Sequence, residues 1–134
     1  MLYTDRKTMI VLNDTTKEVI FKTLGPLVEK WSGGVKLNPT SVYGIRRYTN
    51  NSWMLGHVDK AESHIISVIL NVAQDVDEDW PLYIKDHRGR GRQVLLQPGE
   101  MIYYESARLV HYIYIRGLIL QQHLIFTLQH CPAW

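Results

Sequence analysis

Short runs of β-forming residues, separated by turn signals about every 8–12 residues, place the strongest constraint on the fold of residues 41–111. The run at 64–72 is almost continuously apolar, which predicts a strand buried on both faces. This spacing is typical of an all-β sandwich or barrel, and we predict a jelly-roll core. The predicted strands cover residues 41–48, 64–72, 81–85, 92–96 and 101–104.

A helical pattern precedes the strands. Asn13 and Asp14 favour a helix N-terminus, and apolar residues then recur at helical spacing from residue 20 to residue 31. Pro26 removes a backbone donor inside this pattern, so we expect a kink or two shorter helices. The chain is therefore predicted to be one domain, mainly β with an N-terminal helix, with a helical flank at 1–40 and a β core at 41–128.

The composition excludes several classes of protein. With 134 residues, 46% of them hydrophobic and 21% charged, the chain has the make-up of a single globular domain. Cys131 is the only cysteine, which rules out an intramolecular disulfide framework and a cysteine-rich zinc site. No apolar run approaches the ~18 residues of a membrane span. Residues 1–7 lack the apolar stretch of a signal peptide, so we expect a cytoplasmic location by default. The oligomeric state is left open.

Four basic residues between positions 85 and 92 raise the question of nucleic-acid binding. The stretch is rich in glycine, contains no interleaved aromatic residues and follows an acidic loop at 75–79. We interpret it as a solvated turn and predict no nucleic-acid partner. The four residues are Lys85, Arg88, Arg90 and Arg92.

An imidazole and a carboxylate stand two residues apart in Met54-Leu55-Gly56-His57-Val58-Asp59. On a strand, residues at this spacing point to the same face, so His57 and Asp59 would project together. His111 lies at the end of another strand-like run and would supply a third ligand if the two strands are neighbours. Two histidines and one carboxylate form the face that binds non-haem Fe(II) in oxygenases and leaves coordination positions open. We therefore predict these three residues as metal ligands.

Further motifs flank these ligands in a recognisable order. They are Arg47-Tyr48 before His57, the buried run 67–71, the stretch 96–101 with its Pro-Gly turn, and finally His111. In this order, over about half of the chain, the sequence resembles the double-stranded β-helix of Fe(II)/2-oxoglutarate-dependent dioxygenases, in particular the prolyl 4-hydroxylase catalytic-domain type.

The resemblance implies both a chemistry and a set of roles. It implies that Fe(II), 2-oxoglutarate and O₂ take part, with ascorbate as a further candidate. It also implies that His57, Asp59 and His111 are the catalytic iron ligands. The hydroxyl of Tyr48 falls where the family often directs a tyrosine toward a carboxylate of 2-oxoglutarate.

Two stretches depart from the family pattern. Residues 77–82 replace a Gly-Gly-Glu-like element, which alters a wall of the pocket and leaves the metal ligands in place. Where family members carry a Lys or Arg that pairs with the far carboxylate of 2-oxoglutarate, this chain has Gln121-Gln122. From Tyr112 onward the pattern is not followed, so the C-terminal part is predicted to be divergent or incomplete.

The far carboxylate still needs a cationic partner, because leaving it unpaired in a partly dehydrated pocket costs several kcal/mol. Arg116 is the only Lys or Arg after His111 and is our candidate. On a continuous strand it would lie on the face opposite His111, so it reaches the cavity only through a bulge or a turn at Gly117. We therefore expect Fe(II) to bind, 2-oxoglutarate to bind weakly and turnover to be low. Tight binding independent of Arg116 would point to Arg46 or Arg47.

The leading functional hypothesis is a dioxygenase that hydroxylates a C–H bond, with peptidyl proline preferred over a free small molecule as the substrate. Trp53, Trp80 and Tyr83 are predicted to line a groove for an extended, proline-containing peptide. Two alternatives keep the fold and the metal: a catalytically weakened homologue, and a cupin-like metal-binding module.

Overall fold

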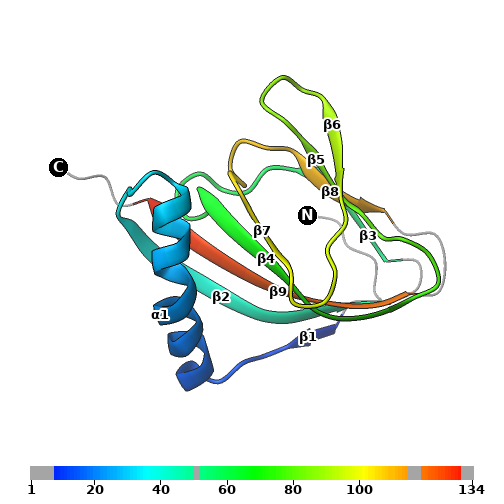
Figure 1. Cartoon of the computed structure of the whole chain (residues 1–134), viewed down its shortest axis with the longest axis horizontal. Helices are drawn as coiled ribbons and strands as arrows, with labels where there is room; N and C mark the ends of the chain where they lie inside the picture. The colour runs from blue at the N-terminus through cyan, green and yellow to red at the C-terminus, as the bar shows by residue number, and fades with distance from the viewer. Residues whose placement is uncertain (1–7, 50–51, 115–118, 131–134) are drawn as a thin grey trace.

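A computed structural model describes residues 8–49, 52–114 and 119–130, and of residues 119–130 it describes the backbone (Figure 1). These described residues form one helix and nine strands. In chain order the elements are β1 (Thr8–Ile10), α1 (Asp14–Trp31), β2 (Leu37–Tyr48), β3 (Trp53–His57), β4 (Ile66–Val76), β5 (Leu82–Lys85), β6 (Gly91–Val94), β7 (Met101–Tyr104), β8 (His111–Tyr114) and β9 (Ile119–His130).

The strands form two sheets packed face to face. The larger sheet has the order β1-β2-β9-β4-β7 and the smaller has the order β3-β8-β5-β6, with antiparallel pairing throughout. Apart from β1, this is the eight-strand, two-sheet arrangement of a jelly roll, so the predicted fold class is confirmed. The larger sheet begins earlier than the predicted core, because β1 lies within residues 1–40 and β2 starts at Leu37.

The C-terminal part of the chain occupies the middle of the larger sheet. The backbone of β9 pairs with β2 along one edge and with β4 along the other. Whatever its divergence in sequence, this segment therefore supplies the central strand, and the described sheet is complete at that position (Figure 1).

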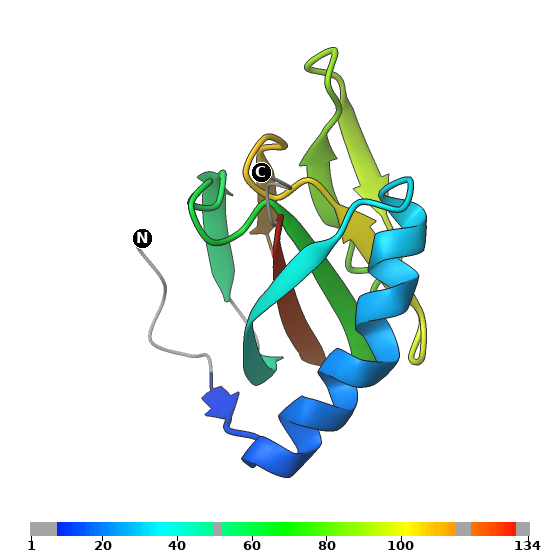
Figure 2. The ribbon, with the colours of Figure 1, turned by 90° about the vertical axis from the view of Figure 1, so that its left-hand side faces the viewer.

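Helix α1 covers the outer face of the larger sheet (Figure 2). The Asn13 side chain caps it by accepting a hydrogen bond from the Thr16 backbone N–H, and Leu24 and Val28 are buried against the sheet. Residues 14–31 form one helix, so the expectation of two shorter helices is wrong. Pro26 lies on the exposed side, where water can satisfy the carbonyl that loses its partner. No helix in the described ranges is long and apolar enough to cross a bilayer.

The interior between the two sheets is mainly aromatic and aliphatic. Tyr48 from β2 packs edge-on against Trp80, with ring centroids 5.2 Å apart, and Tyr104 from β7 is buried beside them. The polar residue Asn71 is also completely buried, and its Nδ2 donates to the carbonyl of Leu96 at 2.7 Å. This bond and two backbone bonds fasten the turn at 97–100 onto β4.

Gly44 is a position in β2 that favours glycine. Its φ is 109°, and a Cβ there would collide with the carbonyl oxygen of Ile10 in β1. We expect Gly44→Ala to destabilise the protein by about 1–3 kcal/mol from backbone strain alone. Gly25→Ala is the matched control, because in α1 the new methyl group meets no atom within 4 Å. It should stabilise by about 0.5–1 kcal/mol. Urea unfolding measures both, and equal effects would contradict the assignment.

Candidate metal centre

His57 and His111 are brought together by the pairing of β3 with β8. They are direct partners in the register, and their ring centroids lie 4.4 Å apart. Met54 is also paired with an inward-facing residue of β8, Ile113, although Met54 and His57 are an odd number of residues apart. A register shift between them adds one residue to β3. This bulge turns both side chains to the interior, where a regular strand would separate them.

Asp59 completes the group from outside the strand. Strand β3 ends at His57, and the Asp59 backbone N–H donates to the carbonyl of Ser106 at 2.8 Å. One carboxylate oxygen, Oδ1, lies 3.4 Å from Nε2 of His57 and 3.8 Å from Nε2 of His111. One ligand atom from each of the three residues lies within 4.8 Å of the others. The three predicted residues therefore converge, although Asp59 reaches the group from a loop and not from the predicted strand.

Both histidines are oriented in the same way. Nδ1 of His57 lies 2.8 Å from the carbonyl oxygen of Leu55, and Nδ1 of His111 lies 2.9 Å from that of Leu109. A carbonyl only accepts hydrogen bonds, so each Nδ1 carries the proton and donates it. In the neutral imidazole, Nε2 then keeps its lone pair and faces the carboxylate. This is the arrangement by which a backbone carbonyl fixes a metal-binding histidine.

The charges within the group support metal binding. The hydrogen bond with Asp59 is the largest influence on His57 and raises the pKa of that imidazole. Burial alone would raise the pKa of Asp59, but its contacts with the two histidines outweigh burial and lower it. Burial lowers the pKa of His111, which therefore stays neutral. A metal ion needs an ionised carboxylate and neutral imidazoles, so two of the three ligands are already in the required form.

A buried serine pair supports the loop that holds Asp59. The hydroxyl of Ser106 donates to the carbonyl of His64 at 2.7 Å. The hydroxyl oxygen of Ser67 lies 2.6 Å from the hydroxyl oxygen of Ser106. Both serines are fully buried. The sequence interpretation missed them, because isolated serines carry no signal of a role in a single sequence.

Tyr48 and Arg46 both lie on β2, near the interior between the two sheets. Tyr48 is 2% exposed, and its hydroxyl lies 3.5 Å from Nη1 of Arg46. The backbone of Tyr48 is opposite Gln121 in the register of β2 with β9. Arg116, the cation suggested from the sequence, lies outside the described residues.

The predicted aromatic groove is wrong. Trp80 is 7% exposed and belongs to the core between the sheets. Tyr83 stacks on Tyr112 with ring centroids 4.8 Å apart, and these two residues alternate with Ile84 and His111, which face inward. Trp53 directly precedes Met54, the residue of β3 that faces the core. Alternation along a strand therefore directs Trp53 and Tyr83 to the outer face of the smaller sheet.

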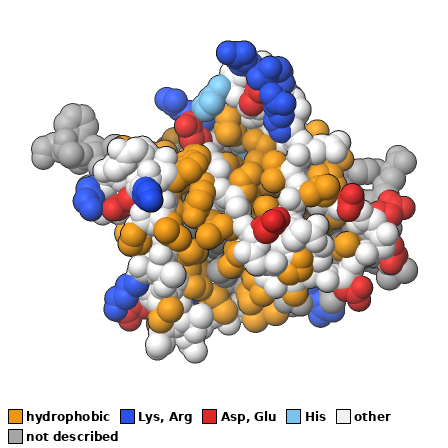
Figure 3. Space-filling view, viewed as in Figure 1, with side chains coloured by type: hydrophobic (Ala, Val, Ile, Leu, Met, Phe, Trp, Pro, Cys, Tyr) orange, Lys and Arg blue, Asp and Glu red, His pale blue; other side chains and the backbone are white. Residues whose placement is uncertain are grey.

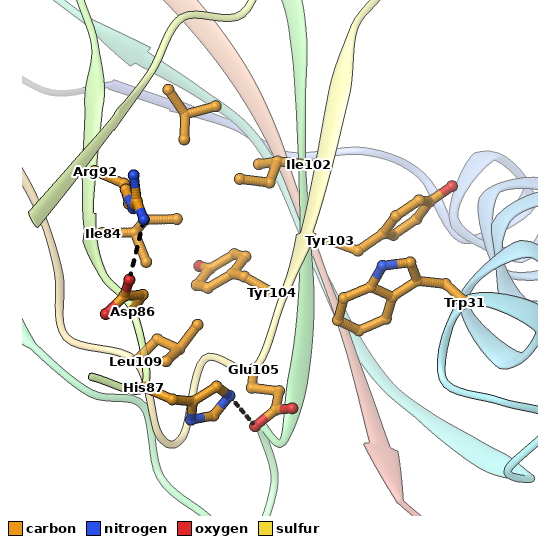
Figure 4. Close-up of a pocket in the computed structure, with 11 residues that line it drawn as sticks. Trp31, Ile84, Asp86, His87, Arg92, Ile102, Tyr103, Tyr104, Glu105 and Leu109 are labelled. Carbon is orange, nitrogen blue, oxygen red and sulfur yellow. Dashed lines mark hydrogen bonds and ion pairs between the residues drawn. The ribbon is translucent and has the colours of Figure 1, made fainter. Parts of the chain in front are cut away.

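A cavity that the sequence did not indicate opens between the edge strands β6 and β7. Its volume is about 250 Å³, and Figure 4 shows Ile84, Ile102, Tyr104 and Leu109 around it. The three candidate ligands do not line it, but Tyr104 does, and its ring packs edge-on against His111 at 5.0 Å. The cavity is thus separated from the metal centre by the Tyr104 ring.

The basic β5–β6 hairpin borders the same cavity. Figure 3 shows its Lys and Arg side chains gathered at one end of the molecule, above an apolar hollow. Arg90 and Arg92 are exposed and lie 2.9 Å and 3.5 Å from the carboxylate of Asp86. The hairpin is therefore a solvated turn with its own ion pairs, as predicted.

The comparisons with known proteins give the fold. No protein-family model and no curated protein sequence matches the chain. Among solved structures, a Pseudomonas putida prolyl-4-hydroxylase aligns with a TM-score of 0.64 at 10% identity, over 96% of this chain and 74% of that one. A 2OG-Fe(II) oxygenase family oxidoreductase from Burkholderia pseudomallei aligns with a TM-score of 0.67 at 16% identity, over 95% of this chain and 64% of that one.

A third similar structure contains a bound peptide. It is a Trichoplax adhaerens prolyl hydroxylase in complex with a hypoxia-inducible factor peptide fragment, with a TM-score of 0.55 at 12% identity, over 90% of this chain and 61% of that one. The chain therefore spans about three fifths to three quarters of the length of these proteins. The resemblance noted in the sequence is confirmed at the level of the fold.

We expect the protein to bind one divalent cation per chain at this centre. Replacing His57, Asp59 or His111 with Ala should abolish tight binding, because only two ligands remain. His87→Ala is the matched control, since this histidine also lies beside a carboxylate, 3.3 Å from Glu105, but belongs to no group of three ligands among the described residues. Anaerobic calorimetric titration with Fe(II) measures the affinities. Wild-type affinity in any of the three ligand variants would contradict the assignment.

As the pH is lowered, metal binding should begin to weaken at a higher pH than it would at an isolated histidine. The proton and the metal compete for Nε2 of His57, and pairing with Asp59 raises the pKa of that imidazole above its usual value of 6.5. Below the raised pKa, the apparent association constant should fall by about tenfold per pH unit. Titrations with Mn(II) between about pH 8 and pH 5.5 cover this range. An affinity that does not change with pH would show that His57 is not a ligand.

Proposed function

We propose that this protein is an Fe(II)- and 2-oxoglutarate-dependent dioxygenase that hydroxylates a C–H bond, with peptidyl proline as the substrate class. The observation that carries the proposal is the convergence of Asp59 Oδ1 with Nε2 of His57 and of His111 inside a jelly roll. Two imidazoles and one carboxylate on one side of a metal are the donor set of non-haem Fe(II) oxygenases, and they leave positions for other ligands.

The residues of this chain would hold and orient the metal. His57, Asp59 and His111 are the ligands, and the hydrogen bonds from each Nδ1 to a backbone carbonyl keep Nε2 aimed at the ion. When bound, Fe(II) with 2-oxoglutarate supplies the oxidative decarboxylation that activates O₂ for hydroxylation. The centre contains no thiolate, which argues against a structural zinc site.

The exposure of the ligands indicates the side from which a substrate approaches. The side chains of His57 and Asp59 are 21% and 19% exposed, whereas that of His111 is 3% exposed. The smaller sheet and the Tyr104 ring cover the centre on the His111 side. A substrate would therefore reach the metal from the side of His57 and Asp59.

Peptidyl proline is supported by the names of two similar structures, which are prolyl hydroxylases, one of them with a peptide bound. The competing function is a weakened homologue that binds metal alone, and Gln121 at the position of the family's cation favours it. A cupin-like metal-binding module would behave in the same way toward 2-oxoglutarate.

Anaerobic spectroscopy of the Fe(II) protein separates these functions. A charge-transfer band that appears only when 2-oxoglutarate is added supports the dioxygenase. Metal binding without the band favours the weakened homologue or the cupin-like module. If no metal is taken up, the site itself is ruled out.

With O₂ and a proline-rich peptide, we expect decarboxylation of 2-oxoglutarate to rise and the peptide to gain one oxygen atom on proline, detected by mass spectrometry. The Asp59→Ala protein should lose turnover by more than about 100-fold, because two ligands hold the metal poorly. Decarboxylation that free amino acids or nucleobases stimulate, while proline peptides do not, would move the substrate class away from peptides.

A further inference from the structure

A dicarboxylate cosubstrate poses an electrostatic problem in this protein. One end of 2-oxoglutarate would chelate the metal, and its far carboxylate would lie in the interior between the sheets, where an unpaired charge is strongly unfavourable. Where the family pattern places a cation, this chain has Gln121-Gln122, on β9. Arg116 lies outside the described residues, and among the described ones a cation on a neighbouring strand that faces the same interior can supply the charge.

Arg46 is placed to supply it. Arg46 and Tyr48 are two residues apart on β2, so their side chains leave the same face of the sheet, and the Tyr48 ring is buried in the core between the sheets. The backbone of Arg46 is opposite His123, but its Nη1 lies 3.5 Å from the hydroxyl of Tyr48, whose backbone is opposite Gln121. The Arg46 guanidinium thus lies beside the end of a buried side chain, on the strand next to the one where the family pattern places a cation.

The guanidinium of Arg46 is close enough to the candidate metal centre to interact electrostatically with His57 and with Tyr104, whose ring packs against His111. Arg46 is half-buried, which is consistent with a head group directed inward.

We propose that Arg46 binds the far carboxylate of 2-oxoglutarate, with the hydroxyl of Tyr48 beside it. This inference rests on the proposed dioxygenase function and replaces the expectation that 2-oxoglutarate binds weakly. A guanidinium can donate two parallel hydrogen bonds to one carboxylate, which gives geometric selectivity as well as affinity. The protein should therefore select 2-oxo acids that carry a second carboxylate at the correct distance.

The neighbouring residue provides a matched control. Arg47 has the same side chain, but it follows Arg46 on the strand, is exposed and pairs with Thr8 at the edge of the larger sheet. Alternation directs it to the other face. Replacing Arg46 or Arg47 removes the same charge from the protein, so only position distinguishes the two variants.

Binding of two 2-oxo acids to the anaerobic Fe(II) protein tests the proposal, by calorimetry and by the charge-transfer band. The second compound is 2-oxopentanoate, which keeps the metal-chelating end and lacks the far carboxylate. Wild type should bind 2-oxoglutarate about 10- to 100-fold more tightly than 2-oxopentanoate. Arg46→Gln should lose that preference, while the Fe(II) protein still binds 2-oxopentanoate and shows its charge-transfer band. Arg46→Lys should restore part of the preference, and Arg47→Gln should behave as wild type.

Three results would overturn the proposal. The first is a wild type that binds the two acids equally, which needs no variant and so does not depend on how a substitution folds. The second is tight, selective binding that survives in Arg46→Gln, which leaves the dioxygenase function intact and moves the anchor elsewhere. The third is a wild type that binds Fe(II) but neither acid, in which case the proposed function fails as well.

Discussion

The β-bulge in β3 is the feature on which the candidate site depends. Met54 and His57 are three residues apart, so a regular strand that buried Met54 in the core would direct His57 to the outer face. The extra residue between them places both inside, and the pairing of β3 with β8 then sets His57 against His111. Asp59 follows two residues later, close enough for a short loop to return its carboxylate to the two imidazoles. One local irregularity thus brings three candidate metal ligands together inside a hydrophobic sandwich.

The loop between β7 and β8 orients two of these ligands. Its residue Ser106 accepts the backbone hydrogen bond of Asp59, and Leu109 accepts the Nδ1 hydrogen bond of His111. The buried hydroxyls of Ser67 and Ser106 attach the same loop to β4 and to the carbonyl of His64. Because backbone carbonyls make both ligand contacts, many side chains would be compatible with them, and a single sequence shows no motif there. Backbone hydrogen bonds from one loop thereby hold two of the three candidate ligands.

The parts of this protein that follow from local pattern could be predicted from its sequence, and the parts that depend on strand register could not. Turn signals and apolar runs indicated the jelly roll, and the spacing of Asn13 and the apolar residues after it indicated α1. Residue type and order picked out His57, Asp59 and His111 as candidate metal ligands, and the structure brings these three residues together. The direction of Tyr83 was predicted wrongly, because a shift of one residue reverses the face of every side chain on a strand. The bulge in β3 was not predicted either, and Gly56 is the signal that was overlooked, because an isolated glycine inside a strand pattern suggests a bulge.

The C-terminal strand shows why a missing residue is weak evidence for a missing function. Gln121-Gln122 departs from the family pattern, yet the backbone of β9 pairs with β2 over residues 121–130 and with β4 over residues 119–128. Neighbouring strands lie about 4.8 Å apart, a distance that an arginine side chain spans easily. A charge facing the interior can therefore be supplied from β2 or from β9 without any change in the backbone. What the chemistry fixes is the place where the charge is needed, and several strands of a jelly roll converge on that place.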